Sequence, residues 1–395
     1  MKKKLKDVCT QVRGVSYKPS DLRDENSGVP ILRANNIQDT GIVLDELVYV
    51  DSSKVHSEQY LLTDDIVICA SSGSKNLVGK AATFKSDLSA SFGAFCKVVR
   101  INNSDDLCKA YIQQYFQSKI YRNAISESSA GANINNIKTE DIEALEIPLP
   151  SKEEQIKIAA ELDTIQSAID NKKQQLALLD EAVKSEFVEM FGENPVESGK
   201  WKVEKLEDIS TVQTGGTPSR NHPEYFEGNI PWVTTANLGK NELTYEDAME
   251  YISQDAINNS ATKIIPANSL FIGIRVGVGK CSINRVDMCS NQDICGLSGF
   301  DTTIINLVFL KKVLDSYSDF FENAKRGTTI KGIKSDTIKK LKIFIPELNI
   351  QNQFASFIQQ IDKSKFVLQQ QLQFIKKYVI MTSWRKICFY TTVAM

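Results

Sequence analysis

Apolar residues recur at heptad spacing in the middle of the chain, just after two closely spaced prolines. Ser151 and Glu154 have the spacing of a capping box, in which the Ser hydroxyl accepts from a backbone amide and the Glu side chain reaches back to the Ser amide. Gly192 and Pro195 mark the other end, so a helix is predicted over residues 151–192. Its apolar stripe consists of Ile158, Leu162, Ile165, Ile169, Leu176, Leu179 and Val183.

A second stripe with the same period but less regular spacing predicts another helix over residues 348–382. Its members are Phe354, Ile358, Ile361, Leu368, Leu372, Ile375 and Val379. One interpretation is that each helix packs on its own globular body, as an amphipathic surface helix does. We favour mutual antiparallel pairing of the two stripes, because a single body cannot cover a stripe of this length.

The two helices close two copies of a longer repeat. Residues 4–8 return as residues 205–209, an offset of 201. An Ile-Pro pair followed by Gln155 returns with Gln353, an offset of 198, and the intervening markers keep their order. A period of this size is too long for a small solenoid repeat, so the sequence indicates two whole domains.

Mixed secondary structure is predicted within each copy. Residues 65–69 and 269–273 are short β-rich runs followed by loops rich in Gly and Ser. Residues 108–120 and 304–321 have helical patterns. The predicted fold class is therefore α+β, with two pseudo-symmetric globular domains separated by two long antiparallel coiled-coil helices.

The chain is accordingly expected to divide into five parts. The final part does not resemble the corresponding end of the first helix, so it is treated as an atypical tail. The parts are a globular domain at 1–150, a helix at 151–192, a second globular domain at 193–347, a helix at 348–382 and the tail at 383–395.

The amino-acid composition indicates a globular protein and argues against several kinds of functional site. With 42% hydrophobic residues and no apolar run long enough for a bilayer, a globular protein of the cytoplasm is expected. The eight cysteines contain no Cys-x-x-Cys pair, and His56 and His222 are the only histidines. A metal site, a disulfide framework and a His-based catalytic triad are therefore not expected.

Segments of the sequence that resemble enzyme motifs lack residues that those motifs require. Residues 273–281 resemble a phosphate-binding loop, but Ile274 stands where Gly is needed and Cys281 stands where Ser or Thr is needed. An adenine methyltransferase loop of the Asn-Pro-Pro-Tyr type is missing, and the nearest run, Asn194-Pro195, more simply ends a helix. No catalytic constellation is predicted.

Charge is distributed unevenly along the chain. The net charge is −2, yet residues 151–190 alone hold five Lys against nine Asp and Glu. Residues 325–342 hold seven Lys and Arg against the single acid Asp336, and cations recur at 75, 80 and 85 and again at 275, 280 and 285. Cationic loops at equivalent places in both copies favour a polyanion partner, namely DNA.

A family resemblance follows from several of these motifs together. Residues 214–220 read Thr-Gly-Gly-Thr-Pro-Ser-Arg, Tyr225 and residues 230–235 follow, and residues 147–159 form the transition into the first helix. The chain resembles the specificity subunit of type I restriction-modification systems over nearly its whole length. Residues 13–20 depart from the pattern, because they lack the Gly-Gly-Thr-Pro-Ser run of the second copy.

The resemblance implies a non-catalytic subunit that reads a bipartite site in double-stranded DNA with two target recognition domains. The two helices would form the spacer between those domains. Two methyltransferase subunits and two restriction-translocation subunits would be its partners. S-adenosylmethionine, ATP and Mg would be bound by those partners, and no cofactor would be bound by this chain.

Reading of DNA would place loops of each domain in the major groove, where Arg and Lys pair with guanine and Asn pairs with adenine. The residues expected to contact DNA are Arg13, Tyr17, Lys18, Arg33, Asn35, Asn36, Ser74, Lys75, Asn76, Lys80, Thr217, Ser219, Arg220, Thr235, Asn237, Arg275, Lys280, Lys325, Arg326 and Lys331. Two alternatives remain open: a methyltransferase or nuclease in its own right, and a coiled-coil scaffold without a role in DNA binding.

Overall fold

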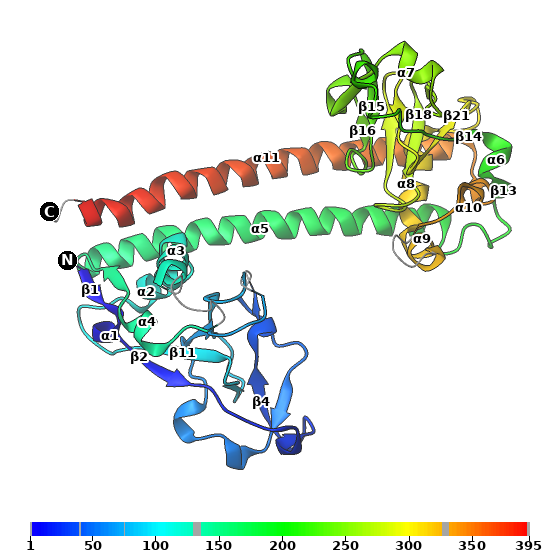
Figure 1. Ribbon diagram of the computed structural model, residues 1–395. Helices are drawn as coiled ribbons and strands as arrows, with labels where there is room; N and C mark the ends of the chain where they lie inside the picture. Colours follow the sequence, from blue (N-terminus) through cyan, green and yellow to red (C-terminus); the bar gives the residue numbers. More distant parts are fainter. Residues whose placement is uncertain (1, 39–40, 75, 129–135, 326–331, 393–395) are drawn as a thin grey trace. The chain divides into compact units, whose positions relative to one another are not determined.

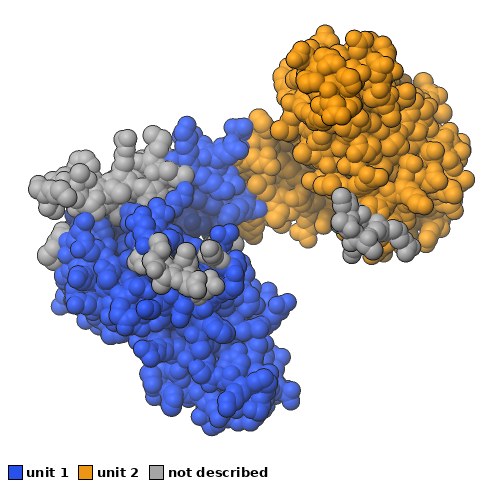
Figure 2. Space-filling model, in the orientation of Figure 1, with its two compact units in different colours: residues 1–173, 370–395 blue, residues 174–369 orange. Residues whose placement is uncertain are grey.

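The computed structural model describes residues 2–38, 41–74, 76–128, 136–325 and 332–392, the last fifteen of them by their backbone only. It contains two compact units. The first comprises residues 1–173 and 370–395, and the second comprises residues 174–369 (Figures 1 and 2). Each unit combines one globular body with parts of the two long helices.

The body of the first unit is built on small sheets. A four-stranded sheet has the order β2-β11-β8-β9, and a second has the order β10-β4-β7-β3. The strands are β1 (Lys2–Lys4), β2 (Cys9–Arg13), β3 (Leu22–Arg23), β4 (Val29–Leu32), β5 (Ile37–Gln38), β6 (Gly41–Ile42), β7 (Val48–Val50), β8 (Ile66–Cys69), β9 (Ala81–Thr83), β10 (Ser91–Phe92), β11 (Cys96–Ile101) and β12 (Glu146–Pro148). The helices are α1 (Leu5–Val8), α2 (Lys109–Phe116), α3 (Lys119–Ser128), α4 (Thr139–Glu143) and α5 (Lys152–Phe191), whose last residues belong to the second unit.

The body of the second unit repeats this plan. Its main sheet has five strands in the order β14-β21-β18-β19-β16, and a smaller sheet has the order β17-β15-β20. The strands are β13 (Lys202–Lys205), β14 (Thr211–Thr214), β15 (Ile230–Val233), β16 (Glu242–Leu243), β17 (Glu250–Ile252), β18 (Ser269–Gly273), β19 (Cys281–Asn284), β20 (Cys289–Ser290), β21 (Ile294–Ser298) and β22 (Lys342–Ile345). The helices are α6 (Leu206–Ile209), α7 (Gln254–Asn258), α8 (Leu307–Ser316), α9 (Ser318–Ala324), α10 (Ser335–Lys339) and α11 (Leu348–Thr392).

The mixed α+β class is confirmed, and the central strands β8 and β18 lie where the sequence predicted them. Every residue of both strands is buried, because each has a strand on either side in its sheet. The helical patterns at 108–120 and 304–321 each form two helices rather than one. In the first unit the break is capped, since the Ser118 hydroxyl accepts from the Tyr121 amide at the start of α3 (3.1 Å).

A buried glutamine joins α5 to the body of the first unit. Gln155 is 1% exposed, and its Oε1 accepts from the amide of Cys108 (2.9 Å). Its Nε2 donates to the carbonyls of Asp106 (3.0 Å) and Pro150 (3.0 Å). One side chain thus satisfies three backbone groups where the helix, the strand before it and the α2 loop meet.

The second unit contains the same device at the start of α11. Gln351 is fully buried, its Oε1 accepts from the Asn306 amide (2.9 Å), and its Nε2 donates to the carbonyls of Ile304 (2.8 Å) and Pro346 (2.7 Å). The predicted counterpart, Gln353, is exposed instead. The repeat offset is therefore 196 at this point, not 198, because the proline that supplies the carbonyl lies five residues before the glutamine in both copies.

The apolar stripes begin inside the bodies. Ile158 and Leu162 pack in the hydrophobic core of the first unit, and Phe354 and Ile358 pack in that of the second. Val183, from the far end of α5, also lies in the second core. At their first turns the helices are therefore covered by their own bodies, as the alternative interpretation expects, while the helix–helix seam stays a prediction.

Some of the remaining stripe residues also lie next to a body: Ile361 packs against the second core, and Ile165 and Ile169 line a cavity with residues of the first body. Within the second unit, α5 and α11 touch directly: the rings of Phe187 and Phe354 are 5.8 Å apart, and Lys365 donates to Asp180. The other described stripe residues are buried or half-buried: Ile165, Ile169, Leu176, Leu179, Ile361, Leu368, Leu372 and Ile375. The side chain of Val379 lies outside the described part of the chain.

The sequence predicted both ends of α5 closely, but it did not predict where α11 ends. The Ser151 hydroxyl accepts from the Glu154 amide (3.3 Å), as the predicted cap requires, and α5 ends at Phe191 before Gly192 with its φ of 87°. Helix α11 continues to Thr392, so residues 383–392, predicted to be a separate tail, extend the helix.

A largely buried ion pair supports the body of the first unit. Asp65 is 3% exposed, and the Arg100 guanidinium donates to both of its carboxylate oxygens (3.0–3.2 Å). The same guanidinium also donates to the carbonyls of Glu58 (2.8 Å) and Tyr60. This arrangement fixes the segment before β8 against β11.

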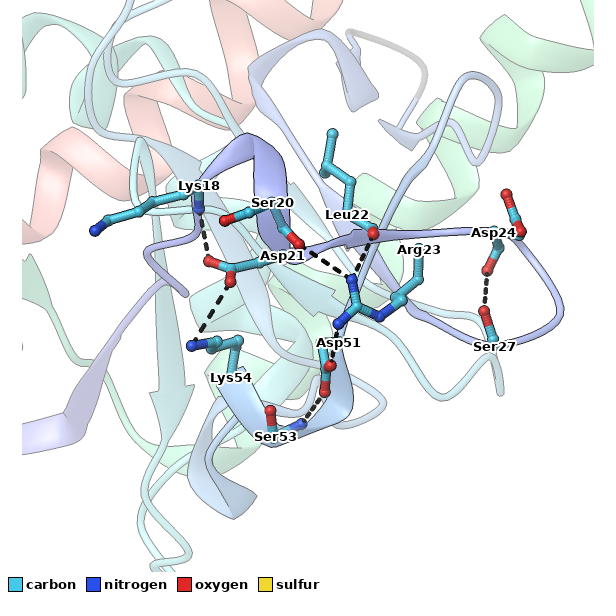
Figure 3. A network of polar contacts seen from close by, with 10 residues as sticks. All are labelled: Lys18, Ser20, Asp21, Leu22, Arg23, Asp24, Ser27, Asp51, Ser53 and Lys54. Atoms are coloured by element: carbon cyan, nitrogen blue, oxygen red, sulfur yellow. Dashed lines mark hydrogen bonds and ion pairs between the residues drawn. The ribbon is translucent and has the colours of Figure 1, made fainter.

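An exposed polar network lies elsewhere in the same body (Figure 3). Arg23 donates to the Asp51 carboxylate (2.5 Å), while Asp21 accepts from the backbone amide of Lys18 (2.8 Å) and pairs with Lys54 (3.6 Å). Hydrogen bonds from Ser53 and Arg23 lower the pKa of the Asp51 carboxyl to about 2.

Replacing Arg100 by Ala is expected to lower the free energy of unfolding by about 3 kcal/mol, because Asp65 would remain buried without its partner. Urea unfolding of the full chain followed by circular dichroism measures the change. The matched control is Arg23→Ala, whose ion pair is exposed and should move the urea midpoint much less. Equal shifts for the two variants would contradict this account.

Candidate nucleic-acid interface

Three segments of the second unit meet where β18 ends. The amide of Ile274 donates to the carbonyl of Asp293 (2.8 Å), and the amide of Ile333 donates to the carbonyl of Ile274 (2.8 Å). Residues 274–280, 291–293 and 332–334 are called the second loop cluster below. Backbone bonds hold these segments together although they lie far apart in the sequence.

The first unit has an equivalent set of segments where β8 ends. The Ala70 amide donates to the Phe95 carbonyl (2.9 Å), and the Ile137 amide donates to the Ala70 carbonyl (2.8 Å). The described residues among 70–80, 93–95 and 136–138 are called the first loop cluster. The bonding pattern matches that of the second unit, so the repeat in the sequence is also a repeat of loop geometry.

A Val-Gly-Lys turn shapes each cluster. The Gly79 amide donates to the Cys69 carbonyl (2.8 Å), and the Gly279 amide donates to the Gly273 carbonyl (2.9 Å). Both turn glycines have positive φ, 79° and 82°. A Cβ on Gly279 would lie 2.6 Å from the ring of the buried Phe321. Only glycine fits these turns, which therefore set the positions of the following lysines.

Several predicted DNA-binding residues lie on the two clusters. Arg275 and Lys280 are exposed on the second cluster, and Arg275 pairs with Asp293 (3.3 Å). On the first cluster Ser74 and Asn76 are exposed and Lys80 is half-buried. Lys325, half-buried, precedes the second cluster's last segment and pairs with Glu322. Lys75, Arg326 and Lys331 lie outside the described residues.

Two predicted base-reading asparagines have structural roles instead. Asn36 is 1% exposed, accepts from the Arg33 amide (2.8 Å) and donates to two carbonyls, while Asn237 is 8% exposed and donates to the Asp247 carbonyl (2.8 Å). Thr235 is buried as well. The two amides are thus already bonded to backbone groups, so their contact with a base edge stays a prediction that this structure does not support. A polar residue after a strand signals a turn as well as a reading position.

A family model describes this arrangement. The model for the type I restriction modification DNA specificity domain matches residues 1–181 and again residues 198–376. The chain belongs to this family. The two matches coincide with the two copies of the repeat, so each globular body with its long helix is one specificity domain.

Individual relatives agree with this assignment. The chain is 41% identical over 179 residues to the type I restriction enzyme StySPI specificity subunit of Salmonella potsdam, an alignment that covers 45% of this chain and 38% of the relative. It is 29% identical over 390 residues to the EcoKI specificity subunit of Escherichia coli K12, covering 90% of this chain and 80% of the relative.

Solved structures show the same fold. The S subunit of a type I restriction-modification system from M. genitalium matches with a TM-score of 0.56 at 13% identity, covering 96% of this chain and 93% of its own. A chain from a structure of the type I R-M system matches with a TM-score of 0.57 at 16% identity, over 98% of this chain and 96% of that one.

Residues 214–220, which contributed to the family resemblance, pack closely against neighbouring backbone in the second specificity domain. A Cβ on Gly215 would lie 2.3 Å from the Asn291 carbonyl oxygen, and the Gly216 carbonyl accepts from the Trp232 indole (3.0 Å). Thr217 and Ser219 are exposed beside this contact, and Thr217 donates to the loop-cluster residue Gln292.

Arg220, predicted to bind DNA, is already paired. Its guanidinium makes two bonds to the Glu250 carboxylate (2.6 and 2.8 Å) and lies 4.0 Å from the centre of the Phe226 ring. Hydrogen bonding to Arg220 lowers the pKa of the Glu250 carboxyl. The pair holds the segment after the Gly-Gly run against β17, so Arg220 has a structural partner in this domain.

The other predicted DNA-binding residues of the first domain lie outside its loop cluster. Arg13, Lys18 and Asn35 are exposed, and the Lys18 side chain points away from the polar network around it (Figure 3). Tyr17 is half-buried and packs in a small hydrophobic cluster. Arg33 is half-buried and donates to the Glu46 carbonyl (2.9 Å).

Sequence reasoning missed two exposed apolar side chains on the loop clusters. Phe95 of the first cluster is 70% exposed, and Val276 of the second is 57% exposed. The sequence places both residues near glycines, but it does not show that their side chains are exposed. Across the described residues there is no group of acidic, Cys and His side chains placed for a metal ion, and no helix suited to crossing a membrane.

Gly279→Ala is expected to lower the free energy of unfolding by more than about 1 kcal/mol, since Ala would carry the left-handed backbone cost and also collide with Phe321. Gly299→Ala is the matched control, because Gly299 has a similar φ of 74° and its nearest neighbour would be 3.7 Å away. Urea unfolding compares the two. If Gly299→Ala destabilised the chain as much, the contact with Phe321 would be irrelevant.

Proposed function

We propose that the chain is the DNA-recognition subunit of a type I restriction-modification complex and that each loop cluster reads one word of a bipartite site. The observation that carries the proposal is the recurrence of cationic loops with the same backbone geometry in two domains that both match the specificity-domain model. The subunit itself is not catalytic. Its relatives are specificity subunits by name, which supports the same role here.

The chemistry of the clusters suits the major groove. Arg275 and Lys280 supply donors for guanine or for phosphate, and Asn76 supplies the amide that pairs with adenine. Phe95 and Val276 supply apolar contacts of the kind that thymine methyl groups accept. Such contacts specify sequence, whereas lysines towards the edge of the cluster position the DNA backbone.

The long helices act as the spacer between the two words. Direct contacts between α5 and α11 within the second unit, such as the Phe187–Phe354 ring contact, support an antiparallel pairing of the two stripes. Recognition elements on one face of DNA must lie about one helical turn, or roughly 34 Å, apart. A rigid helical pair sets such a distance better than a flexible linker does.

The partners are two methyltransferase subunits and two restriction-translocation subunits. These partners bind S-adenosylmethionine, ATP and Mg, and this chain binds none of them. The assembly works in the cytoplasm, where its DNA substrate lies. Family membership and the relatives' names support action within a type I restriction system.

Selection from a randomised DNA pool by the complex with its methyltransferase partner tests the function. We expect two short words separated by a fixed gap. The chain alone, incubated with DNA and S-adenosylmethionine, should transfer no methyl group. Enrichment of a single uninterrupted word, or methyl transfer without a partner, would overturn the proposal.

Lys280→Ala refines this test. It is expected to weaken selection of the second word, by about 1–3 kcal/mol if Lys280 contacts a base, and to leave the first word unchanged. Lys202→Ala is the control, because Lys202 is exposed in the same unit but lies on β13, outside the loop cluster. An equal effect of both variants on both words would show that Lys280 contributes only general charge.

Inserting four residues into α5 near Lys172 tests the spacer. The insertion adds about one helical turn, or roughly 6 Å of rise, so the selected gap should change while both words persist. The selected pool reports the gap directly. A change in the words themselves would be inconsistent with a helical spacer.

A further inference from the structure

Cys69 and Cys96 face each other across two neighbouring strands of the first unit. Cys69 ends β8, Cys96 begins β11, and the two are direct partners in the antiparallel register. Both side chains lie in the same hydrophobic cluster, together with Val67 and Val98. The two thiols are therefore on the same face of the sheet, as directly opposed residues must be.

The hydrogen bonds identify which kind of antiparallel pair this is. The neighbouring pair is hydrogen-bonded, since the Ala70 amide donates to the Phe95 carbonyl (2.9 Å). The Cys69 amide points to the other side and donates to the Lys80 carbonyl (2.8 Å). Because the two kinds of pair alternate along a ladder, Cys69 and Cys96 form a non-hydrogen-bonded pair, whose Cα atoms lie about 4.5 Å apart.

We propose that Cys69 and Cys96 are a modification site that forms a cross-strand disulfide when the protein meets a peroxide-class oxidant. The Cα separation of a non-hydrogen-bonded pair falls within the range of roughly 4.4–6.8 Å that disulfides require. The strands already hold the two sulfurs on one face, so closure needs no rearrangement of the fold.

The reaction balances with peroxide as the only oxidant. The Cys69 sulfur attacks a peroxide oxygen, the O–O bond breaks, and a sulfenic acid and one water form. The Cys96 sulfur then attacks the Cys69 sulfur, the S–S bond forms and the second water leaves. The two thiols lose two electrons and two protons, which reduce hydrogen peroxide to water.

Cys69 is the better first nucleophile of the two. Burial raises the pKa of both thiols, that of Cys96 to about 12, but the positive charges of Arg122 and Lys80 oppose the rise at Cys69. The thiolate is the reactive form, so the reaction starts at Cys69. Because both side chains are buried, the reaction is slow and favours a small oxidant.

The second unit provides an internal control. At the equivalent place it has Gly273 opposite Ile294, so no thiol pair exists there. Cys281 and Cys295 both lie opposite Ile272, one on each side of β18. They are two strand spacings apart, about 9.5 Å, which is too far for a disulfide.

The bond would close the ladder at the base of the first loop cluster. It would lie directly before residues 70 and 71, and the amides of Ala70 and Ser71 both donate to the Phe95 carbonyl. A covalent link at this point restricts how far residues 70–74 and 93–95 can separate. The consequence for DNA, which rests on the proposed function, is a changed affinity for the first word alone.

Peptide mapping of the native full-length chain tests the site. The protein is treated with hydrogen peroxide, free thiols are blocked before denaturation, and linked peptides are found by mass spectrometry. We expect a Cys69–Cys96 linkage about 2 Da lighter than the two thiols, reversed by dithiothreitol, while Cys281 and Cys295 stay unlinked. Cys69→Ala should abolish the linkage and leave Cys96 a thiol.

Three results would overturn the site: both cysteines still reduced after the half-buried Cys108 has reacted, separate oxidation of Cys69 and Cys96 to sulfinic acids, or linkage of either to another cysteine. Selection from the randomised pool with the oxidised complex then tests the consequence. Oxidation should shift enrichment of the first word several-fold and leave the second unchanged. Equal enrichment in both redox states would refute the consequence, whereas failure of the reduced complex to select any word would refute the proposed function.

Discussion

The buried carboxamides of Gln155 and Gln351 are the interactions on which each half of this protein depends. Each one bonds two backbone groups of the loop before α2 or α8 and the carbonyl of the proline between the last strand and the long helix. Buried backbone groups need partners, and a single amide supplies three of them at one point. The direction in which a long helix leaves its body is therefore fixed by hydrogen bonds rather than by apolar contact alone.

The apolar stripes of the helices consequently serve two purposes. Ile158 and Phe354 complete the cores of their own bodies, while Leu176 and Leu368 lie further along, outside those cores. A heptad pattern predicts that one face of a helix is buried, but it does not predict which part of the protein covers that face. Packing of each helix on its own body holds for the first part of each stripe, and the direct contacts between α5 and α11 lie within the second unit.

The halves share a framework and differ in chemistry. The Val-Gly-Lys turns and the backbone bonds between loops recur, because a left-handed glycine beside a buried side chain leaves one geometry open. The side chains placed on that framework do not recur: Phe95 stands where Asp293 stands, and a pair of thiols stands where Gly273 and Ile294 stand. A constant frame with variable loop residues lets one fold present two different surfaces.

The sequence by itself determined the duplication, the α+β class, the positions of β8 and β18, the start of α5 and the cationic loops, because these depend on local periodicity, capping and turn chemistry. Only the tertiary structure decided that Gln351 is the partner of the repeat. It also decided that Asn36 and Asn237 are buried and that Arg220 is paired with Glu250. A polar side chain looks the same in sequence whether it faces a base or an internal carbonyl, and only the packing around it distinguishes the two.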